Sequence, residues 1–292
     1  MTEKAPLKVT DMKAGYNEAI KPSELIQISG HQNLTLNARR AITILWHNAH
    51  RQGIEEGKDY VIELADLRTD GHRGLAQVEE AVMALMQTIL TVRLSGNRVR
   101  RVQFLGGNDM SDPSRPAGVL TYSFDKRLVE ILRDSSIWGR IAIPVLMAFS
   151  SKYAVSLYEN ASQWSNLQHK VVQDMTIADL RDLMGVEEGK YVAFGDLNIH
   201  VIKPAVREIN GLAPFNVSVL PVKAGRRVVG VSIGWWRKSN EELQLAFQEA
   251  QRPKVGRKAR LSGSVETVFD PSQSANMLAR KGRLALRASE DE

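Results

Sequence analysis

The order of hydrophobic and polar positions predicts the same run of elements twice along the chain. In the first half, a short β-branched run leads into Ala65–Arg68, which opens a short helix. A longer helix follows from Leu75 to Ile89, with apolar residues at three-four spacing. A two-stranded hairpin then spans residues 91–108, with Ser95–Asn97 as its turn.

The second half repeats this order. The tetrapeptide Ala-Asp-Leu-Arg recurs at Ala178–Arg181 and opens a short helix that ends near Gly185, a typical helix-terminating residue. A longer helix over 196–210 and a hairpin over 215–236 follow. Strand, short helix, turn, longer helix and hairpin is the order of a winged helix.

The repeated tetrapeptide has a physical interpretation as the start of a helix-turn-helix. Its Leu is expected to pack the short helix, and its Asp lies in the first turn, where a negative charge suits the helix dipole. The alternative is a shared helix start without shared descent. The order of the elements favours a repeat more strongly than the four residues do.

Flanking elements set the expected domains. A long amphipathic helix precedes each unit, over 33–54 with Thr35 or Asn37 as its cap and over 144–164 with Pro144 at its start. Together the elements predict an α+β protein with two tandem winged-helix domains related by an internal repeat. The expected parts are an N-terminal arm (1–25), a first domain (26–140), a second domain (141–238) and a basic, flexible, disordered tail (239–292). The alternative for the tail is a segment that orders on binding a partner.

The composition of the chain excludes several classes of function. The 292 residues include no cysteine, which excludes disulfides, cysteine-based zinc sites, iron–sulfur clusters and cysteine nucleophiles. The longest apolar run, Ile141–Phe149, is far short of the ~20 residues that a membrane span needs, and the N-terminus lacks the apolar block of a signal peptide. We therefore expect a cytoplasmic protein. The net charge of +6 suggests an acidic polymer as its partner.

The positive charge is concentrated in the two hairpins, and neither hairpin contains an acid. In a winged helix the hairpin, or wing, lies along the phosphate backbone, where Lys and Arg neutralise phosphates. The alternative is that these are solvated cations that protect a sheet edge from aggregation. The candidate phosphate contacts are Arg93, Arg98, Arg100 and Arg101 in the first hairpin and Lys223, Arg226 and Arg227 in the second.

The two longer helices differ in their outward residues. In the second, Asp196, His200, Lys203 and Arg207 stand at i, i+4, i+7 and i+11, with Asn198 beside them and Lys190 in the preceding turn. Lys and Arg can donate to guanine and Asn can pair with adenine, so this face is a candidate for reading bases; the alternative is a plain solvent face. We further expect Pro204 to kink this helix.

The outward face of the first helix carries Gln77, Glu79, Glu80, Ala84 and Gln87. Because carboxylates are repelled by phosphate, we expect the first domain to hold DNA mainly by its hairpin and the second to supply most of the specificity.

The patterns of common catalytic sites are missing from the sequence. The segment Gly185–Tyr191 has the wrong glycine spacing for a P-loop. His47 and His50 are spaced to share a metal on a helix, but nothing nearby offers a third ligand. Adjacent acidic pairs point their side chains apart. The sequence predicts a binding protein without catalytic residues, metal or cofactor.

The second unit resembles a known family. The segments Ser150–Trp164, Met175–Val186, Lys190–Asn210 and Lys223–Ile233 resemble the iteron-binding plasmid replication initiators of the RepA/RepE kind. In that family a helix with a Ser-Lys-Tyr-Ala…Leu-Tyr-Glu pattern precedes the second winged helix, and the reading helix ends in Glu-Ile-Asn, here at residues 208–210. The resemblance spans residues 30–238.

The resemblance implies a replication initiator whose second domain inserts its helix into the major groove of direct repeats at an origin. It also implies a homodimer, formed through the first domain, that represses its own gene at an inverted repeat. Monomers would open the origin with host replicative helicase and host initiator as partners. Some members carry an Arg cluster where this chain has Asn198, Ile199 and His200, so the base sequence read is expected to differ.

Geometry gives a compatible expectation without the family. Two different winged helices on one face of double-stranded DNA would occupy successive major grooves about 10 bp apart and read an asymmetric site. The alternative is a transcriptional regulator built from the same modules without an origin role. A DNA-processing enzyme is a third possibility, opposed by the missing catalytic cluster.

Overall fold

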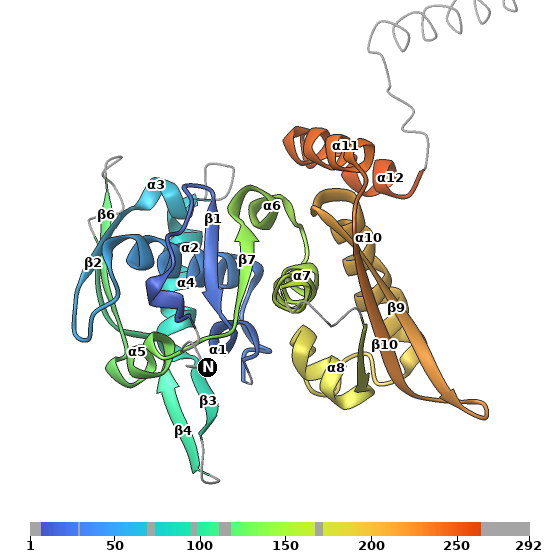
Figure 1. Cartoon of the computed structure of the whole chain (residues 1–292), viewed down its shortest axis with the longest axis horizontal. Coiled ribbons are helices and arrows are strands. Elements are labelled where there is room, and N and C mark those ends of the chain that lie inside the picture. The colour runs from blue at the N-terminus through green and yellow to red at the C-terminus, as the bar shows by residue number, and fades with distance from the viewer. Residues whose placement is uncertain are drawn as a thin grey trace, which may run out of the picture. The chain divides into compact units, whose positions relative to one another are not determined.

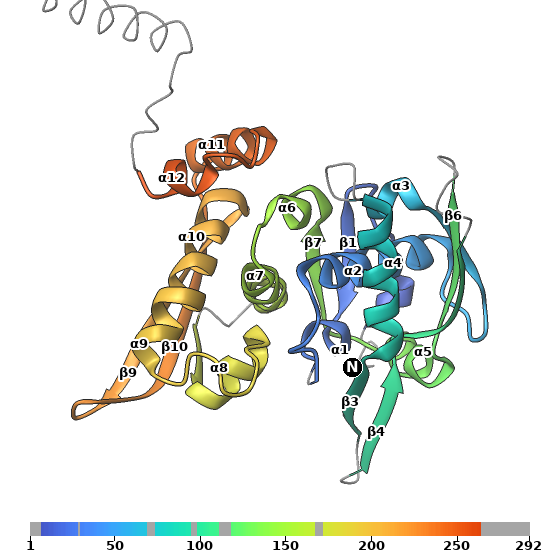
Figure 2. The same ribbon diagram turned by 180° about the vertical axis from the view of Figure 1, so that it is seen from behind.

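The computed structural model describes residues 7–28, 30–68, 74–94, 98–110, 118–166 and 172–263. It separates into two compact units, Met1–Arg252 and Pro253–Glu292. The second unit contributes one described helix, α12 (Arg257–Leu261). All other elements belong to the first unit (Figures 1 and 2). No helix in these ranges combines the length and apolar character that crossing a membrane requires.

The first half of the large unit is a mixed α/β domain (Figure 1). Its elements are η1 (Val9–Asp11), β1 (Glu18–Pro22), α1 (Ser23–Ile26), α2 (Leu36–Gln52), β2 (Tyr60–Glu63), α3 (Leu64–Leu67), α4 (Gly74–Gln87), β3 (Ile89–Leu94), β4 (Arg98–Gln103), β5 (Leu105–Met110), β6 (Val119–Phe124) and α5 (Lys126–Arg133).

The second half follows the same order. Its elements are β7 (Trp138–Ala142), α6 (Ile143–Ala148), α7 (Lys152–Ser165), β8 (Val172–Thr176), α8 (Ile177–Met184), α9 (Phe194–Leu197), the π-helical turn η2 (Asn198–Ile202), α10 (Lys203–Leu212), β9 (Phe215–Ala224), β10 (Arg227–Arg237) and α11 (Asn240–Gln251).

The internal repeat is longer than the two winged helices. Strand, short helix and long helix precede each unit as β1-α1-α2 and β7-α6-α7. The strands β1 and β7 pair antiparallel with each other, with Ile20 opposite Arg140 at the centre of five paired positions. Because antiparallel strands are related by a two-fold axis at their centre, this pair joins the two copies with local pseudo-two-fold symmetry.

The two copies differ in their sheets. In the second, β8 pairs with β10 and β10 with β9, so the hairpin continues into a three-stranded sheet. In the first, the β3–β4 hairpin is separate, and β2 pairs with β6, which pairs with β5. Strand β6 therefore occupies the place beside β2 that the hairpin strand takes in the second copy.

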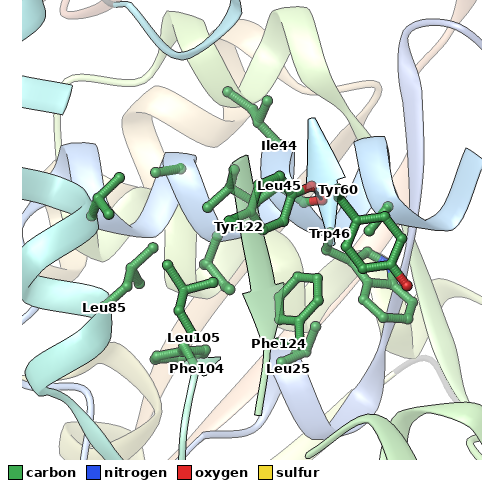
Figure 3. Close-up of a cluster of buried hydrophobic side chains, with 14 of the residues drawn as sticks. Leu25, Ile44, Leu45, Trp46, Tyr60, Leu85, Phe104, Leu105, Tyr122 and Phe124 are labelled. Atoms are coloured by element: carbon green, nitrogen blue, oxygen red, sulfur yellow. Dashed lines mark hydrogen bonds between the residues drawn. The ribbon is translucent and has the colours of Figure 1, made fainter. Parts of the chain in front are cut away.

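Each domain has its own buried apolar cluster, built around its long helix. In the first, Trp46 of α2 packs edge-on against Phe124, and Tyr60 and Tyr122 lie beside them (Figure 3). Thr35 caps α2 by accepting from the Ala38 amide, as predicted. The second cluster combines buried residues of α7, α8, α9, η2, α10, β9 and β10, and in it the ring of Tyr158 from α7 stacks on Phe215.

The repeated tetrapeptide does mark equivalent helix starts. Leu67 of α3 and Leu180 of α8 are both buried. Asp66 and Asp179 both lie in the first turn of their helices, and Asp179 completes a capping box with Thr176. The turn after Arg68 lies outside the described residues.

Several predicted boundaries are wrong. Over its described part, residues 7–25, the expected arm belongs to the fold, because Val9, Ala19 and Ile20 are fully buried and β1 pairs with β7. The predicted boundary between residues 140 and 141 falls inside β7. These errors share one cause: the pairing joins strands about 120 residues apart in sequence, which local patterns do not record.

Two predicted segments also differ in their helices. The helix expected over 144–164 is two, α6 and α7, separated at Phe149–Ser151, where the Ser151 side chain caps α7. The disorder expected from residue 239 is wrong at its start, because α11 begins there with a capping box between Ser239 and Glu242. Residues 264–292 of the expected tail lie outside the described residues.

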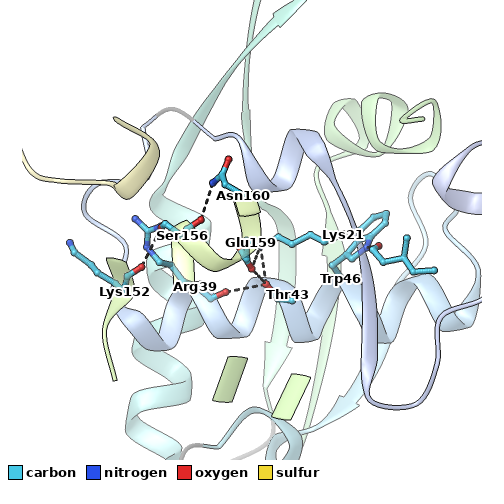
Figure 4. Close-up of polar contacts among 9 residues, drawn as sticks. Lys21, Arg39, Thr43, Trp46, Lys152, Ser156, Glu159 and Asn160 are labelled. Atoms are coloured by element: carbon cyan, nitrogen blue, oxygen red, sulfur yellow. Dashed lines mark hydrogen bonds and ion pairs between the residues drawn. The ribbon is translucent and has the colours of Figure 1, made fainter. Parts of the chain in front are cut away.

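A buried polar cluster joins the two copies at α2 and α7 (Figure 4). Lys21 of β1 is 1% exposed and donates to Glu159 of α7 at 2.6 Å and to Thr43 of α2 at 2.9 Å. The Thr43 hydroxyl also donates to Glu159 at 2.9 Å. Beside it, the guanidinium of Arg39 donates to the Ser156 hydroxyl. The long helices of the two repeats are thus linked by ionic and polar contacts that are closed to solvent.

Candidate nucleic-acid interface

The helix-turn-helix of the second domain is fixed by its helix ends. Thr176 accepts from the Asp179 amide at 3.1 Å, and the Asp179 carboxylate accepts from the Thr176 amide, which together start α8. Gly185 ends this helix in the left-handed conformation, with φ of 64°, as the sequence predicted. The turn that follows, residues 185–193, leads into the reading helix formed by α9, η2 and α10.

Arg181, the last residue of the repeated tetrapeptide, holds this turn in place. Its guanidinium donates to the carbonyls of Tyr191 at 2.9 Å, Lys190 at 2.6 Å and Glu187 at 3.3 Å. Tyr191 has φ of 50°, a conformation that non-glycine residues seldom adopt. The three hydrogen bonds offset that strain and fix the direction in which the chain enters the reading helix.

The reading helix contains a π-helical turn where a kink was predicted. The turn spans Asn198–Ile202 and lies just before Pro204, which has no amide hydrogen to continue the regular α-helical hydrogen bonds. A π turn advances fewer degrees per residue than an α turn. The predicted stripe at i, i+4, i+7 and i+11 is therefore not straight: the residues before η2 are rotated against those after it.

The outward side of the reading helix is polar, as predicted. His200 and Lys203 are exposed, and Asn198 and Arg207 are partly exposed. The His200 ring stacks on Tyr191, with 5.4 Å between centroids and 24° between planes. The opposite side is apolar and buried in the core; its buried residues are Leu197, Val201, Ile202, Ala205, Ile209 and Leu212.

Lys190 lies in the turn just before the reading helix. Its ammonium pairs with Glu187 at 2.5 Å, and this contact raises the pKa of Lys190. Glu187 also pairs with Lys152 of α7 at 3.2 Å. One carboxylate is thus shared between two lysines, one from the turn and one from α7.

The Glu-Ile-Asn end of the reading helix has structural contacts. Glu208 accepts from the Ser150 amide at 2.9 Å and from its hydroxyl, which ties the helix to the start of α7. Ile209 is buried, and Asn210 exchanges hydrogen bonds of 2.7 and 3.0 Å with the Val217 backbone. These residues fix how the reading helix meets α7 and β9.

The second wing carries its cations at an exposed tip. Strands β9 and β10 run antiparallel from Phe215 opposite Arg237 to Ala224 opposite Arg227, and Gly225 turns the chain with φ of 62°. The side chains of Lys223, Arg226 and Arg227 are exposed there. The structure therefore brings these three predicted phosphate contacts together.

The first wing brings together only part of its predicted set. Arg98 and Arg101 of β4 are exposed. Arg100 instead turns toward α5, where it pairs with Glu130 at 2.7 Å and donates to the Arg127 carbonyl at 3.2 Å. The side chain of Arg93 and the hairpin turn lie outside the described residues. Sequence alone does not show the Arg100 pair, because its acid comes from another element.

The exposed side of α4 matches the predicted difference between the domains. Glu79, Glu80 and Gln87 are exposed, whereas Gln77 is partly covered and accepts from Asn37 at 3.4 Å. The helix contains no Lys or Arg. Its charge is therefore opposite in sign to that of both wings.

The paired histidines of α2 serve the fold. His47 and His50 are buried and each uses Nε2 to contact a backbone carbonyl, of Tyr16 at 3.0 Å and of Val9 at 2.9 Å. Burial lowers the pKa of both. Each ring holds part of the N-terminal segment, and the described residues contain no group of three or more side chains arranged to hold a metal.

Comparisons with known proteins agree with this architecture. The chain matches the family described as "Initiator Replication protein, WH1" over residues 18–162 and that described as "Initiator Rep protein, WH2" over residues 176–235. The first match begins at β1, in accord with the pairing of that strand. No curated protein sequence matches the chain.

Two solved structures are similar to the chain at low identity. The Pi initiator protein, solved in complex with iteron DNA, is 18% identical, with a TM-score of 0.56 over 77% of this chain and 98% of that chain. Domains 2 and 3 of RctB are 13% identical, with a TM-score of 0.43 over 70% and 81%. The two family matches together cover both winged-helix domains, and the chain belongs to the initiator Rep protein family.

Proposed function

We propose that this protein is a plasmid replication initiator that binds directly repeated DNA sites, or iterons, through its two winged helices. One observation carries the proposal: the exposed cations Lys223, Arg226 and Arg227 stand on the same domain as a reading helix whose polar side faces away from the core. A wing that contacts phosphate positions the protein, and a helix that contacts base edges specifies the site.

Family membership supports the same conclusion. The Pi initiator protein, which shares this fold, was solved with iteron DNA bound. In the present chain we assign base reading to Asn198, His200, Lys203 and Arg207, with Lys190 at the helix start. Phosphate contacts are assigned to both wings, with Arg98 and Arg101 in the first.

The finer steps of initiation are also part of the proposal. Monomers would open the origin and recruit host helicase with the host initiator, and homodimers formed through the first domain would repress the protein's own gene. Their support is the resemblance to the RepA/RepE kind of initiator. The protein would act as a non-enzymatic, cytoplasmic DNA-binding factor, since no nucleophile–base pair or P-loop occurs in its sequence.

A DNase footprint on the non-coding DNA that flanks the protein's own gene tests the proposal. Several protected, equally spaced direct repeats of about two turns each are expected. A single protected inverted repeat over the promoter would contradict an origin role and leave a transcriptional repressor. Protection without any preferred site would contradict both.

The wing assignment has a separate test in the salt dependence of binding. Each Arg that neutralises a phosphate contributes about 0.9 to the slope of log affinity against log salt, so Arg226→Ala with Arg227→Ala flattens it by about one to two units. Binding to all sequences weakens together. The matched control, Lys13→Ala with Arg51→Ala, removes two exposed cations outside both wings and leaves the slope unchanged. A loss confined to the specific site would contradict the wing assignment.

A further inference from the structure

The reading helix exposes one apolar side chain among its polar ones. Ile199 lies in the π-helical turn and is 57% exposed. Its neighbours in sequence are Asn198 and His200, both candidates for base contacts. Every other Ile, Leu or Val from Leu197 to Leu212 is buried or partly buried. Ile199 therefore does not belong to the domain's core.

The π turn explains why Ile199 faces outward. Leu197 is buried before the turn, and both Val201 and Ile202 are buried at its end. The three residues between them, 198–200, are all at least partly exposed. Because the turn is wider than an α turn, this run of three stays on the outer side while the flanking residues keep their contacts with the core.

The chemistry of the exposed side chain selects its partner. A major-groove surface offers donors and acceptors on every base pair, but only one apolar group, the 5-methyl of thymine. Asn198 and His200 have polar groups that can hydrogen-bond the donors and acceptors, and Ile199 has methyl groups that can pack against the thymine methyl. On the proposed function, the first turns of the reading helix enter the major groove, which places Ile199 against base edges.

We propose that Ile199 is a specificity-determining residue that contacts a thymine methyl group in the recognised site. This inference rests on the proposed function and adds the chemical feature of the site that one residue reads. Removing either the thymine methyl or the Ile199 side chain leaves the other group without its apolar contact, a loss of buried surface equivalent to about one methylene. The expected loss of affinity is therefore about fourfold for either change.

The test replaces thymine by deoxyuridine, which deletes the methyl group and leaves base pairing intact. Duplexes containing the footprinted site carry one such replacement each, and binding is measured for the full chain and for Ile199→Ala. The native chain should lose about fourfold at one or two positions. Ile199→Ala should bind the thymine and deoxyuridine duplexes equally at those positions, and Ile199→Val should restore part of the difference.

Two controls separate this effect from misfolding and general loss of apolar surface. Ile199→Ala replaces an exposed helical residue with a stronger helix former, so its thermal unfolding should match that of the native chain. Leu245→Ala removes a 66%-exposed leucine from α11, at the other end of α10 from α9 (Figure 2). It should retain the full response to deoxyuridine.

Three results would overturn the inference in distinguishable ways. A native chain indifferent to every deoxyuridine position would show that no thymine methyl is read. A response that persists in Ile199→Ala would assign the contact to another apolar residue, such as Val192, which is 80% exposed in the preceding turn. Failure of the native chain to prefer any DNA site would instead refute the proposed function itself, and the inference with it.

Discussion

The ion pair between Lys21 and Glu159 makes a quantitative prediction about what joins the two repeats. The side chains are 2% and 7% exposed, and their charged atoms are 2.6 Å apart. Lys21→Met removes the cation and leaves the Glu159 carboxylate buried with the Thr43 hydroxyl as a donor. Breaking a buried pair in this way costs about 3–5 kcal/mol, because the remaining charge loses its compensation.

The reverse substitution should cost less. After Glu159→Gln, Lys21 can release its proton and remain buried as a neutral amine that hydrogen-bonds Thr43. Burial already lowers the pKa of Lys21, against the attraction of Glu159, so Lys21 loses its proton more readily once that attraction is removed. The double variant Lys21→Met with Glu159→Leu removes both charges of the pair and should be more stable than Lys21→Met alone.

Urea denaturation at pH 7, followed by circular dichroism, measures these free energies of unfolding. The matched control is an ion pair that also involves β1 but is open to solvent. Arg140 of β7 and Glu18 of β1 lie 2.7 Å apart, and their side chains are 49% and 42% exposed. Arg140→Met should cost at most about 1 kcal/mol. The reasoning that the pair is desolvated would be refuted if Lys21→Met lowered the free energy of unfolding by no more than Arg140→Met does. It would also be refuted if the double variant lost the sum of the two single-variant costs.

Three further predictions concern the second helix-turn-helix and its support. Gly185→Ala should lower the melting temperature, because φ there is 64° and the added Cβ would overlap the guanidinium of Arg39; an unchanged midpoint would show that the loop shifts freely. Arg181→Ala should weaken binding to the specific site about tenfold more than it weakens non-specific binding, because the Tyr191 turn loses hydrogen bonds to a charged group, worth about 1.5–3 kcal/mol each. Gel-shift titrations with specific and random duplexes measure both affinities, and equal losses would reject the positioning role. Burial holds the pKa of His31 at about 3, so the unfolded state takes up the proton first and stability is lost as pH falls from 6.5 toward 3. In urea titrations, His31→Gln should therefore recover about 1.4 kcal/mol of the stability that the native chain loses between pH 7.5 and 5.5. Parallel plots of unfolding free energy against pH for the two proteins would contradict this.

Local sequence signals predicted the helices and hairpins well. The cap at Thr35, the end of α8 at Gly185 and the position of the second hairpin all depend on residues close in sequence. The same kind of signal was present for α11, where Ser239 and Glu242 stand at capping-box spacing. The segment that follows is basic and without periodicity, and this composition favours a prediction of disorder instead.

Features formed by distant residues had no such signal. The β1–β7 pair, the Lys21–Glu159 contact and the pairing of Arg100 with Glu130 each join residues 30 to 138 positions apart. Arg181 is part of the repeated tetrapeptide, but its three carbonyl acceptors depend on the shape of the turn, which the sequence does not show. The exposure of Ile199 depends on a π turn, which the α-helical spacing of the sequence does not show.

The differences between the two copies bear on how the protein would recognise DNA. The strand pair β1–β7 relates the copies by a local two-fold, which by itself would favour a symmetric site. The reading surfaces break that symmetry, because α4 presents Glu79 and Glu80 where the second domain presents His200 and Lys203. One half of the site would then be held mainly through its phosphates and the other read through its bases. A site bound in this way has a direction, so monomers bound to direct repeats would all point the same way along the DNA, whereas the two halves of a symmetric dimer would need an inverted repeat.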